Sequence, residues 1–139
     1  MKGCFDKAKE ILYEIIRQYP NYHEPFNLLG LISEERKEIK KAAHFLNIAA
    51  ELSPTDSLLW EKVGFLYLES KCHEQAASCF SRALKSDQSN IKIVLARVEC
   101  YIYLGDIRKA IKSLEKVLLN DPLNILVAKK FAKFYAQNN

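Results

Sequence analysis

The sequence predicts an all-α fold, a right-handed superhelix (α-solenoid) of about eight helices packed as antiparallel pairs. The main observation is a repeat: FLNIAAELSPTD at 45–56 is matched in size and polarity at 79–90, at 113–124 and, earlier, at 11–22, always 34 residues apart. Apolar residues within each unit recur with helical spacing. Gly and Pro number four each in 139 residues, which leaves few turns for an all-β fold. A fixed period of this length is typical of stacked helix pairs.

Small residues recur at the same places of every unit. One column reads Ala8, Ala42, Ala76, Ala110, and a second reads Gly30, Gly64, Val98, Ala132. Two antiparallel helices approach closely only where one presents a small side chain to a bulky one. These columns therefore predict the contacts between helices. The bulky side chains predicted for the core are Trp60, Tyr67, Phe80, Tyr101 and Tyr135.

Helix stop and start signals divide the chain in a regular order. Pro54 ends one helix because proline cannot continue the hydrogen-bond ladder, and Asp56 or Ser57 can cap the next. The helices expected from this pattern cover 3–18, 25–36, 39–52, 57–70, 74–86, 91–104, 107–120 and 125–137. We interpret 1–139 as a single array with a half repeat at 3–22, full repeats at 23–56, 57–90 and 91–124, and a half repeat at 125–139.

A few residues depart from the pattern. Lys37 and Lys71 stand at a turn position that is glycine elsewhere, at Gly3 and Gly105. A left-handed backbone there would cost about 1 kcal/mol for each lysine. Gln88 stands where the other units have proline. Arg97 replaces an apolar side chain, so the third unit is expected to pack more loosely or to bend.

The period and columns resemble the tetratricopeptide repeat, or TPR, from residue 3 to residue 136. The resemblance implies that the first helix of each pair lines a concave groove that binds a protein partner. The groove residues that it implies are Glu24, Asn27, Leu31, Leu58, Glu61, Phe65, Lys92, Leu95, Glu99, Lys129 and Lys133. Leu31, Phe65 and Leu95 are expected to be exposed apolar side chains aligned along this groove. Its two acidic residues, Glu61 and Glu99, weigh against the co-chaperone TPR domains, which bind a C-terminal carboxylate.

No catalytic motif or phosphate-binding loop is found in the sequence, so neither an enzyme nor a cofactor is expected. The cysteines are predicted to be free thiols, because the spacing of Cys72, His73 and Cys79 matches no structural zinc site. All three histidines are expected at the surface. The net charge of +4 is spread among mixed signs, and RKEIKK at 36–41 is interpreted as a solvated turn, not a nucleic-acid contact. The polar N-terminus and the lack of a long apolar run predict a soluble intracellular protein.

Several segments outside the shared columns are similar to the TPR subunit family of RNA polymerase III transcription factor IIIC. They are EIIRQYPNYHEPFNLLGLI (14–32), LNIAAELSPTDSLLWEKVGFL (46–66), ALKSDQSN (83–90) and ECYIYLGDIRKAI (99–111). The resemblance implies a nuclear scaffold that recruits initiation factor IIIB, with its Brf and Bdp components, and that contacts other factor IIIC subunits. It implies no small-molecule substrate, no membrane and no direct nucleic-acid contact. The alternatives are a module of an anaphase-promoting-complex-like assembly, a cytoplasmic peptide-binding co-chaperone, or the regulatory array of an enzyme.

Overall fold

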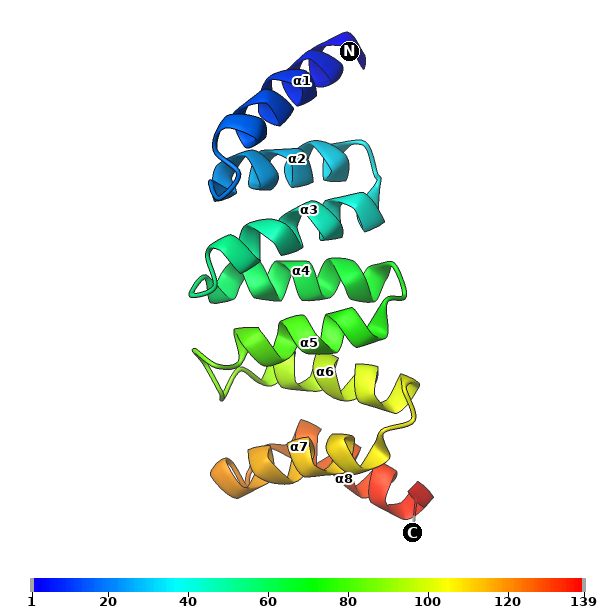
Figure 1. Cartoon of the computed structure of the whole chain (residues 1–139). Helices are drawn as coiled ribbons and strands as arrows, with labels where there is room; N and C mark the ends of the chain where they lie inside the picture. Colours follow the sequence, from blue (N-terminus) through cyan, green and yellow to red (C-terminus); the bar gives the residue numbers. More distant parts are fainter. Residues whose placement is uncertain (1, 139) are drawn as a thin grey trace.

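The computed structural model describes residues 2–138, which form eight helices and no strand. The helices are α1 (Lys2–Gln18), α2 (His23–Glu35), α3 (Ile39–Leu52), α4 (Ser57–Glu69), α5 (His73–Ala83), α6 (Ile91–Tyr103), α7 (Ile107–Asn120) and α8 (Ile125–Asn138). They stack in chain order, with the two termini at opposite ends of the stack (Figure 1). The predicted α-solenoid is confirmed. The predicted array limits at residues 1 and 139 lie outside the described residues.

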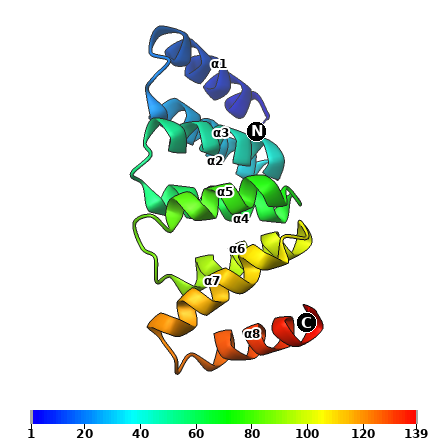
Figure 2. The ribbon, with the colours of Figure 1, turned by 60° about the horizontal axis from the view of Figure 1, so that its bottom comes forward.

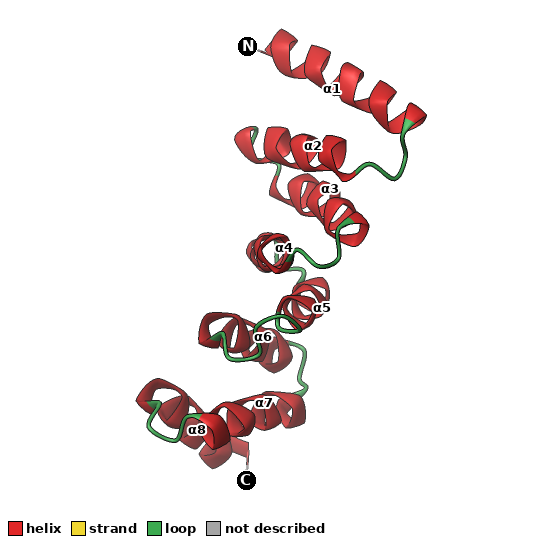
Figure 3. Ribbon diagram, turned by 90° about the vertical axis from the view of Figure 1, so that its left-hand side faces the viewer, coloured by secondary structure: helices red, strands yellow, loops and turns green. Residues whose placement is uncertain are grey.

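The helices form two layers. Figure 3 shows α2, α4 and α6 on one side of the stack and α3, α5 and α7 on the other. Each helix packs mainly against the next one along the chain, and the turned view in Figure 2 shows the same order from α1 to α8. The structure is therefore stabilised almost entirely by local packing between neighbours, as in other solenoids.

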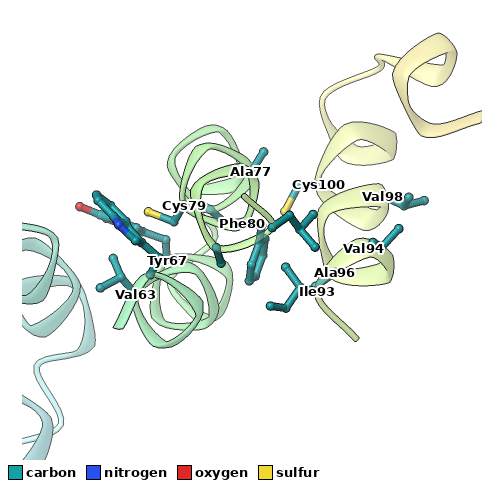
Figure 4. Packing of buried hydrophobic residues seen from close by; sticks show 14 of the residues in the cluster. Val63, Tyr67, Ala77, Cys79, Phe80, Ile93, Val94, Ala96, Val98 and Cys100 are labelled. Carbon is teal, nitrogen blue, oxygen red and sulfur yellow. The ribbon is translucent and has the colours of Figure 1, made fainter. Parts of the chain in front are cut away.

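The hydrophobic core runs without interruption from Ala43 in α3 to Val127 in α8. Trp60, Tyr67 and Phe80 are buried in it, as predicted. In Figure 4, Ile93 and Cys100 lie on the side of α6 that faces Phe80.

The burial predicted for the last two aromatic residues is wrong. Tyr101 is half-buried, and its ring lies beneath the cationic groups of Arg97 and Lys109. Tyr135 is half-exposed because, among the described residues, no helix covers that face of α8; its ring stacks on Phe131 with ring centres 5.7 Å apart.

The small-residue columns mark the closest helix contacts. A Cβ added at Gly30 would lie 2.5 Å from a Leu46 side-chain carbon, and one at Gly64 would lie 2.6 Å from the Phe80 ring. Glycine at these two positions therefore lets α2 approach α3 and α4 approach α5. Residues in the alanine column are fully buried in α3, α5 and α7, whereas Ala8 in α1 is only half-buried.

The turns inside the three helix pairs share one geometry. Lys37 and Lys71 have φ angles of 59° and 65°, and Gly105 has a φ of 80°. Both lysines thus adopt the left-handed backbone that Gly105 adopts in the third pair. Gly3 does not share it, because Gly3 lies inside α1. Our prediction of a turn at Gly3 is wrong, since no helix precedes it within the described residues.

Helix ends follow their capping signals with two exceptions. Asp56 caps α4 by accepting a hydrogen bond from the Leu59 N–H at 3.1 Å. Helix α2 begins at His23 and not at Pro25, because proline is tolerated in the first turn of a helix. Helix α5 ends at Ala83 and not at residue 86. Beyond it, the Asp87 side chain accepts bonds from the Ser89 backbone and hydroxyl, a local turn that competes with the helix.

Candidate protein-interaction surface

All eleven predicted groove residues lie on α2, α4, α6 and α8, the first helices of the predicted pairs. A cavity of about 470 Å³ opens on this face. It brings together four of the predicted residues, Leu58, Glu61 and Phe65 from α4 and Lys92 from α6. Its remaining lining comes from Glu34, Lys62, Leu66 and Glu69. We call this cavity the central hollow.

Charged side chains from neighbouring helices pair across the central hollow. Lys92 Nζ lies 3.4 Å from Glu61 Oε1 and 4.9 Å from the centre of the Phe65 ring. Lys62 Nζ lies 3.1 Å from Glu34 Oε1. These pairs join α4 to α6 and α2 to α4. A protein that binds here would meet alternating positive and negative charges above the apolar side chains that line the hollow.

The expectation of an exposed apolar row is wrong for two of its three members. Phe65 is half-buried and meets Phe80 edge to face, with ring centres 4.9 Å apart. Leu95 is also half-buried and packs against the core. The most exposed apolar side chain of the central hollow is Leu58, at 76%. The 34-residue period alone could not predict these exposures. The way in which α4 packs against its neighbouring helices determines which turn of α4 faces solvent.

The remaining predicted residues do not all share one continuous groove. Leu31 lines a separate apolar wedge of about 360 Å³ between α1 and α2, beside Ile11 and Leu28. Lys129 lines a hollow beside Leu123 and Ile125 at the start of α8. The other five predicted residues line none of these three hollows in the described part of the chain; they are Glu24, Asn27, Leu95, Glu99 and Lys133.

The structure adds charged residues that sequence reasoning missed. Lys130, adjacent to predicted Lys129, pairs with Glu99 at 3.2 Å and links α8 to α6. Glu34 is the acidic partner of Lys62. A pattern of opposite charges about 30 residues apart was the available signal. The pairs also partly neutralise Glu61 and Glu99, which weakens the electrostatic argument against a carboxylate ligand.

Two of the four cysteines are buried in the core. Burial raises the pKa of both Cys79 and Cys100 to about 11, so both thiols are protonated at neutral pH. Across residues 2–138, no group of His, Cys, Asp or Glu side chains has an arrangement that could hold a metal ion. His73 is half-buried and stacks on Tyr103 with ring centres 3.6 Å apart, so its predicted surface position is wrong. None of the described helices has the length and apolar character needed to span a membrane.

Comparison with known proteins agrees with this architecture. A tetratricopeptide repeat family model matches residues 67–134. The chain is 32% identical over 99% of its length to human general transcription factor 3C polypeptide 3, and 27% identical over 96% to fission yeast (Schizosaccharomyces pombe) transcription factor tau subunit sfc4. It spans only 16% and 14% of those two proteins. It is also 25% identical over 96% of its length to fission yeast anaphase-promoting complex subunit 3, of which it covers 21%.

Solved structures show the same fold. The crystal structure of MamA superimposes with a TM-score of 0.67 at 20% identity, over 98% of this chain and 80% of that one. The TPR protein YrrB superimposes with a TM-score of 0.63 at 16% identity, over 94% and 68%. The period, the small-residue columns, the left-handed turns and these similarities agree, and the chain belongs to the tetratricopeptide repeat family.

Proposed function

We propose that this chain is a non-catalytic scaffold module of a nuclear, transcription-factor-IIIC-like assembly, and that it helps to recruit initiation factor IIIB. The observation that carries the proposal is the similarity to human general transcription factor 3C polypeptide 3 over nearly the whole chain. The resemblance to the factor IIIC family seen in the sequence, as at Tyr22 to Phe26, agrees with this similarity. Other factor IIIC subunits and the Brf and Bdp components of factor IIIB are the proposed partners.

The central hollow is the proposed contact surface. It combines exposed Leu58 with the Lys92–Glu61 and Lys62–Glu34 pairs, so a partner helix or strand would bury an apolar anchor and meet charges of both signs. Such a mixed surface suits a folded partner better than it suits a uniformly charged polymer. We therefore propose protein partners for this face, with no small-molecule substrate, no membrane and no direct nucleic-acid contact.

The test is binding of labelled Brf and Bdp fragments to the 139-residue chain, compared with a Leu58→Glu variant. Leu58 is suitable because it is exposed and its replacement leaves the core intact. The matched control is Leu119→Glu, which changes an 83% exposed leucine on α7, in the other layer. We expect Leu58→Glu to weaken binding by about tenfold or more and Leu119→Glu to leave it unchanged. Absence of binding by the folded wild-type chain would contradict the proposal.

An anaphase-promoting-complex-like module is the second candidate, favoured by the similarity to subunit 3 of that complex over 96% of the chain. Only partner identity separates the two candidates. Adding anaphase-promoting-complex subunits to the same binding assay distinguishes them: binding of those subunits, without binding of Brf or Bdp, would favour the second candidate.

A further inference from the structure

A second cavity, of about 520 Å³, opens between α5, α6 and α7. We call it the third-unit cavity. It shares no lining residue with the predicted groove in the described part of the chain. Its apolar lining includes Leu84, Ile91, Val94 and Val117. Its cationic lining is Lys85, Arg97, Lys109, Lys112 and Lys116, opposed within the cavity by the single carboxylate of Asp121.

The cavity lies where the third unit lacks a tryptophan that the second unit has. Val94 stands 34 residues after Trp60, at the same place of the repeat. Trp60 is buried, and its Nε1–H donates to the Pro54 carbonyl oxygen at 3.0 Å. The guanidinium carbon of Arg82 lies 4.5 Å from the centre of the indole ring. In the second unit, an indole therefore fills the space between the helices.

The third unit has no indole at this place but keeps a cationic side chain above it, while Leu84 and Ile91 stand where the second unit has Ala50 and Ser57. Lys116 occupies the place of Arg82, and Gln88 occupies the place of Pro54. Figure 4 shows Val94 and Val98 pointing to the side of α6 opposite Phe80. Valine is much smaller than tryptophan, so an apolar space is left open beneath a cationic side chain.

Arg97 adds a demand for a polar partner inside the cavity. It replaces Val63 of the second unit, and its Nη1 donates to the Ser81 hydroxyl at 3.2 Å. Its Nε is buried and, within residues 2–138, has no hydrogen-bond partner. A buried donor without an acceptor is costly, and a ligand carboxylate would satisfy it. Lys85 and Lys112 also form no ion pair with the described residues.

We propose that the third-unit cavity binds an acidic segment of a partner protein that inserts an aromatic side chain, tryptophan above all, where the second unit has Trp60. The ring would lie against Val94 and Val117 beneath Lys116, and flanking carboxylates would meet Arg97 and the free lysines. An acidic peptide is favoured over nucleic acid because the floor is apolar and lies at the place where the second unit has an indole. The proposal is independent of the central hollow and of the assembly proposed above.

The probe is a fluorescein-labelled nonapeptide with one central tryptophan flanked by aspartate and glutamate residues, titrated with the 139-residue chain. We expect saturable anisotropy changes that weaken as salt is raised, because the contacts between charged groups are screened. Replacing the peptide tryptophan by alanine should weaken binding by about tenfold or more. Equal binding of the alanine peptide would show attraction by charge alone and would overturn the proposal.

The decisive variant is Val94→Trp, which fills the cavity with an indole of the chain itself. We expect it to melt at the same temperature as wild type or higher, and to lose peptide binding by about tenfold or more. Lys112→Glu should also weaken binding, whereas Lys40→Glu, an exposed lysine on α3 that is likewise outside every ion pair of the described residues, should not. Unchanged peptide binding by a folded Val94→Trp variant would overturn the proposal.

A measurement on the wild-type chain covers the case in which Val94→Trp does not fold. Amide chemical shifts on addition of the peptide should change over 84–91 and 109–121. Shifts confined to α2 and α4 would overturn the proposal by placing the peptide on the other layer. A labelled DNA oligonucleotide of equal charge completes the design: tighter binding of DNA than of the peptide, with the same shifts, would assign the cavity to nucleic acid and not to an acidic segment.

Discussion

The second and third units of this array are built on the same columns but are filled differently. In the second unit, Trp60 closes the space between α3, α4 and α5, and Gly64 lets the Phe80 ring lie against the backbone of α4. In the third unit, Val94 and Val98 occupy the corresponding positions, and a cavity of about 520 Å³ remains beside α6. Both units nevertheless have a buried alanine column and a left-handed turn.

This difference shows which contacts hold the solenoid together and which are free to vary. Phe80, Val98 and Leu114 are fully buried although the cavity lies close by. In a solenoid each helix packs on its sequence neighbours, so a gap in one unit does not propagate through the others. A repeat protein can therefore leave a cavity between the helices of one unit for binding while the neighbouring units remain fully packed.

The largest expected effect on stability comes from removing the indole that fills the space between the helices of the second unit. Trp60→Ala removes a buried indole together with its hydrogen bond to Pro54, and should lower the free energy of unfolding by about 3–5 kcal/mol. Val94→Ala should cost less than half as much, because Val94 already borders open space. Urea unfolding followed by circular dichroism measures both. Equal losses would contradict the difference between the two units.

A smaller effect is expected from the close contact inside the second pair. Gly64→Ala would place a Cβ 2.6 Å from the Phe80 ring, and overpacking of this kind costs about 1–3 kcal/mol. The higher helix propensity of alanine offsets about 1 kcal/mol of that cost. The third pair already accepts Val98 in this column, so Val98→Ala should reduce stability by loss of packing instead. A rise in the melting temperature of Gly64→Ala would contradict the close approach.

In the turns, the second pair is expected to be the more strained of the two. Lys71 has a φ of 65° in the second pair, where Gly105 serves the third pair at 80°. Lys71→Gly should stabilise the protein by up to about 1 kcal/mol, because glycine adopts this conformation without strain. Gly105→Lys should destabilise it by a similar amount. Thermal unfolding of the two variants should thus shift in opposite directions, and shifts of the same sign would exclude backbone strain as the cause.

The last effect is absent at neutral pH and appears only as the pH rises above about 9. Cys79 of the second unit and Cys100 of the third have folded pKa values of about 11, against an ordinary value of 9.0. Between those values the unfolded chain releases thiol protons that the folded chain retains, so the free energy of unfolding falls as pH rises from about 9 to 11. Cys79→Ala and Cys100→Ala should each show a shallower fall than wild type in urea titrations. An unchanged slope in both variants would contradict the burial of the thiols in uncharged form.

The helix layout could be predicted from a single sequence because the repeat occurs in it four times. A 34-residue period, alanine and glycine columns and turn signals are properties of positions along the chain. They predicted all eight helices and the positions of the turns at Lys37 and Lys71. They failed at the end of α5, where a local turn at Asp87 competes with the helix, and at Gly3, which lies inside α1.

The candidate site was less accessible, because it depends on pairs of residues from different helices. The period predicted that Leu58, Glu61, Phe65 and Lys92 lie on one layer. Only the structure shows that they line one hollow and that Phe65 is half-buried. It also paired Lys130, and not Lys129, with Glu99. Helix tilt and side-chain direction determine such contacts, and neither can be predicted from the spacing of residues along the sequence.

The sequence by itself thus determined the architecture of this protein, since repeated small and bulky positions admit one way of stacking. Only the tertiary structure decided where the stack is filled and where it is open. Val94 in place of Trp60 is visible as a change of letter. It becomes a cationic cavity only because α5, α6 and α7 do not close over it and Arg97 and Lys116 lie at its wall. The physical reason is that backbone packing is repeated from unit to unit, whereas the volume between helices depends on every side chain that borders it.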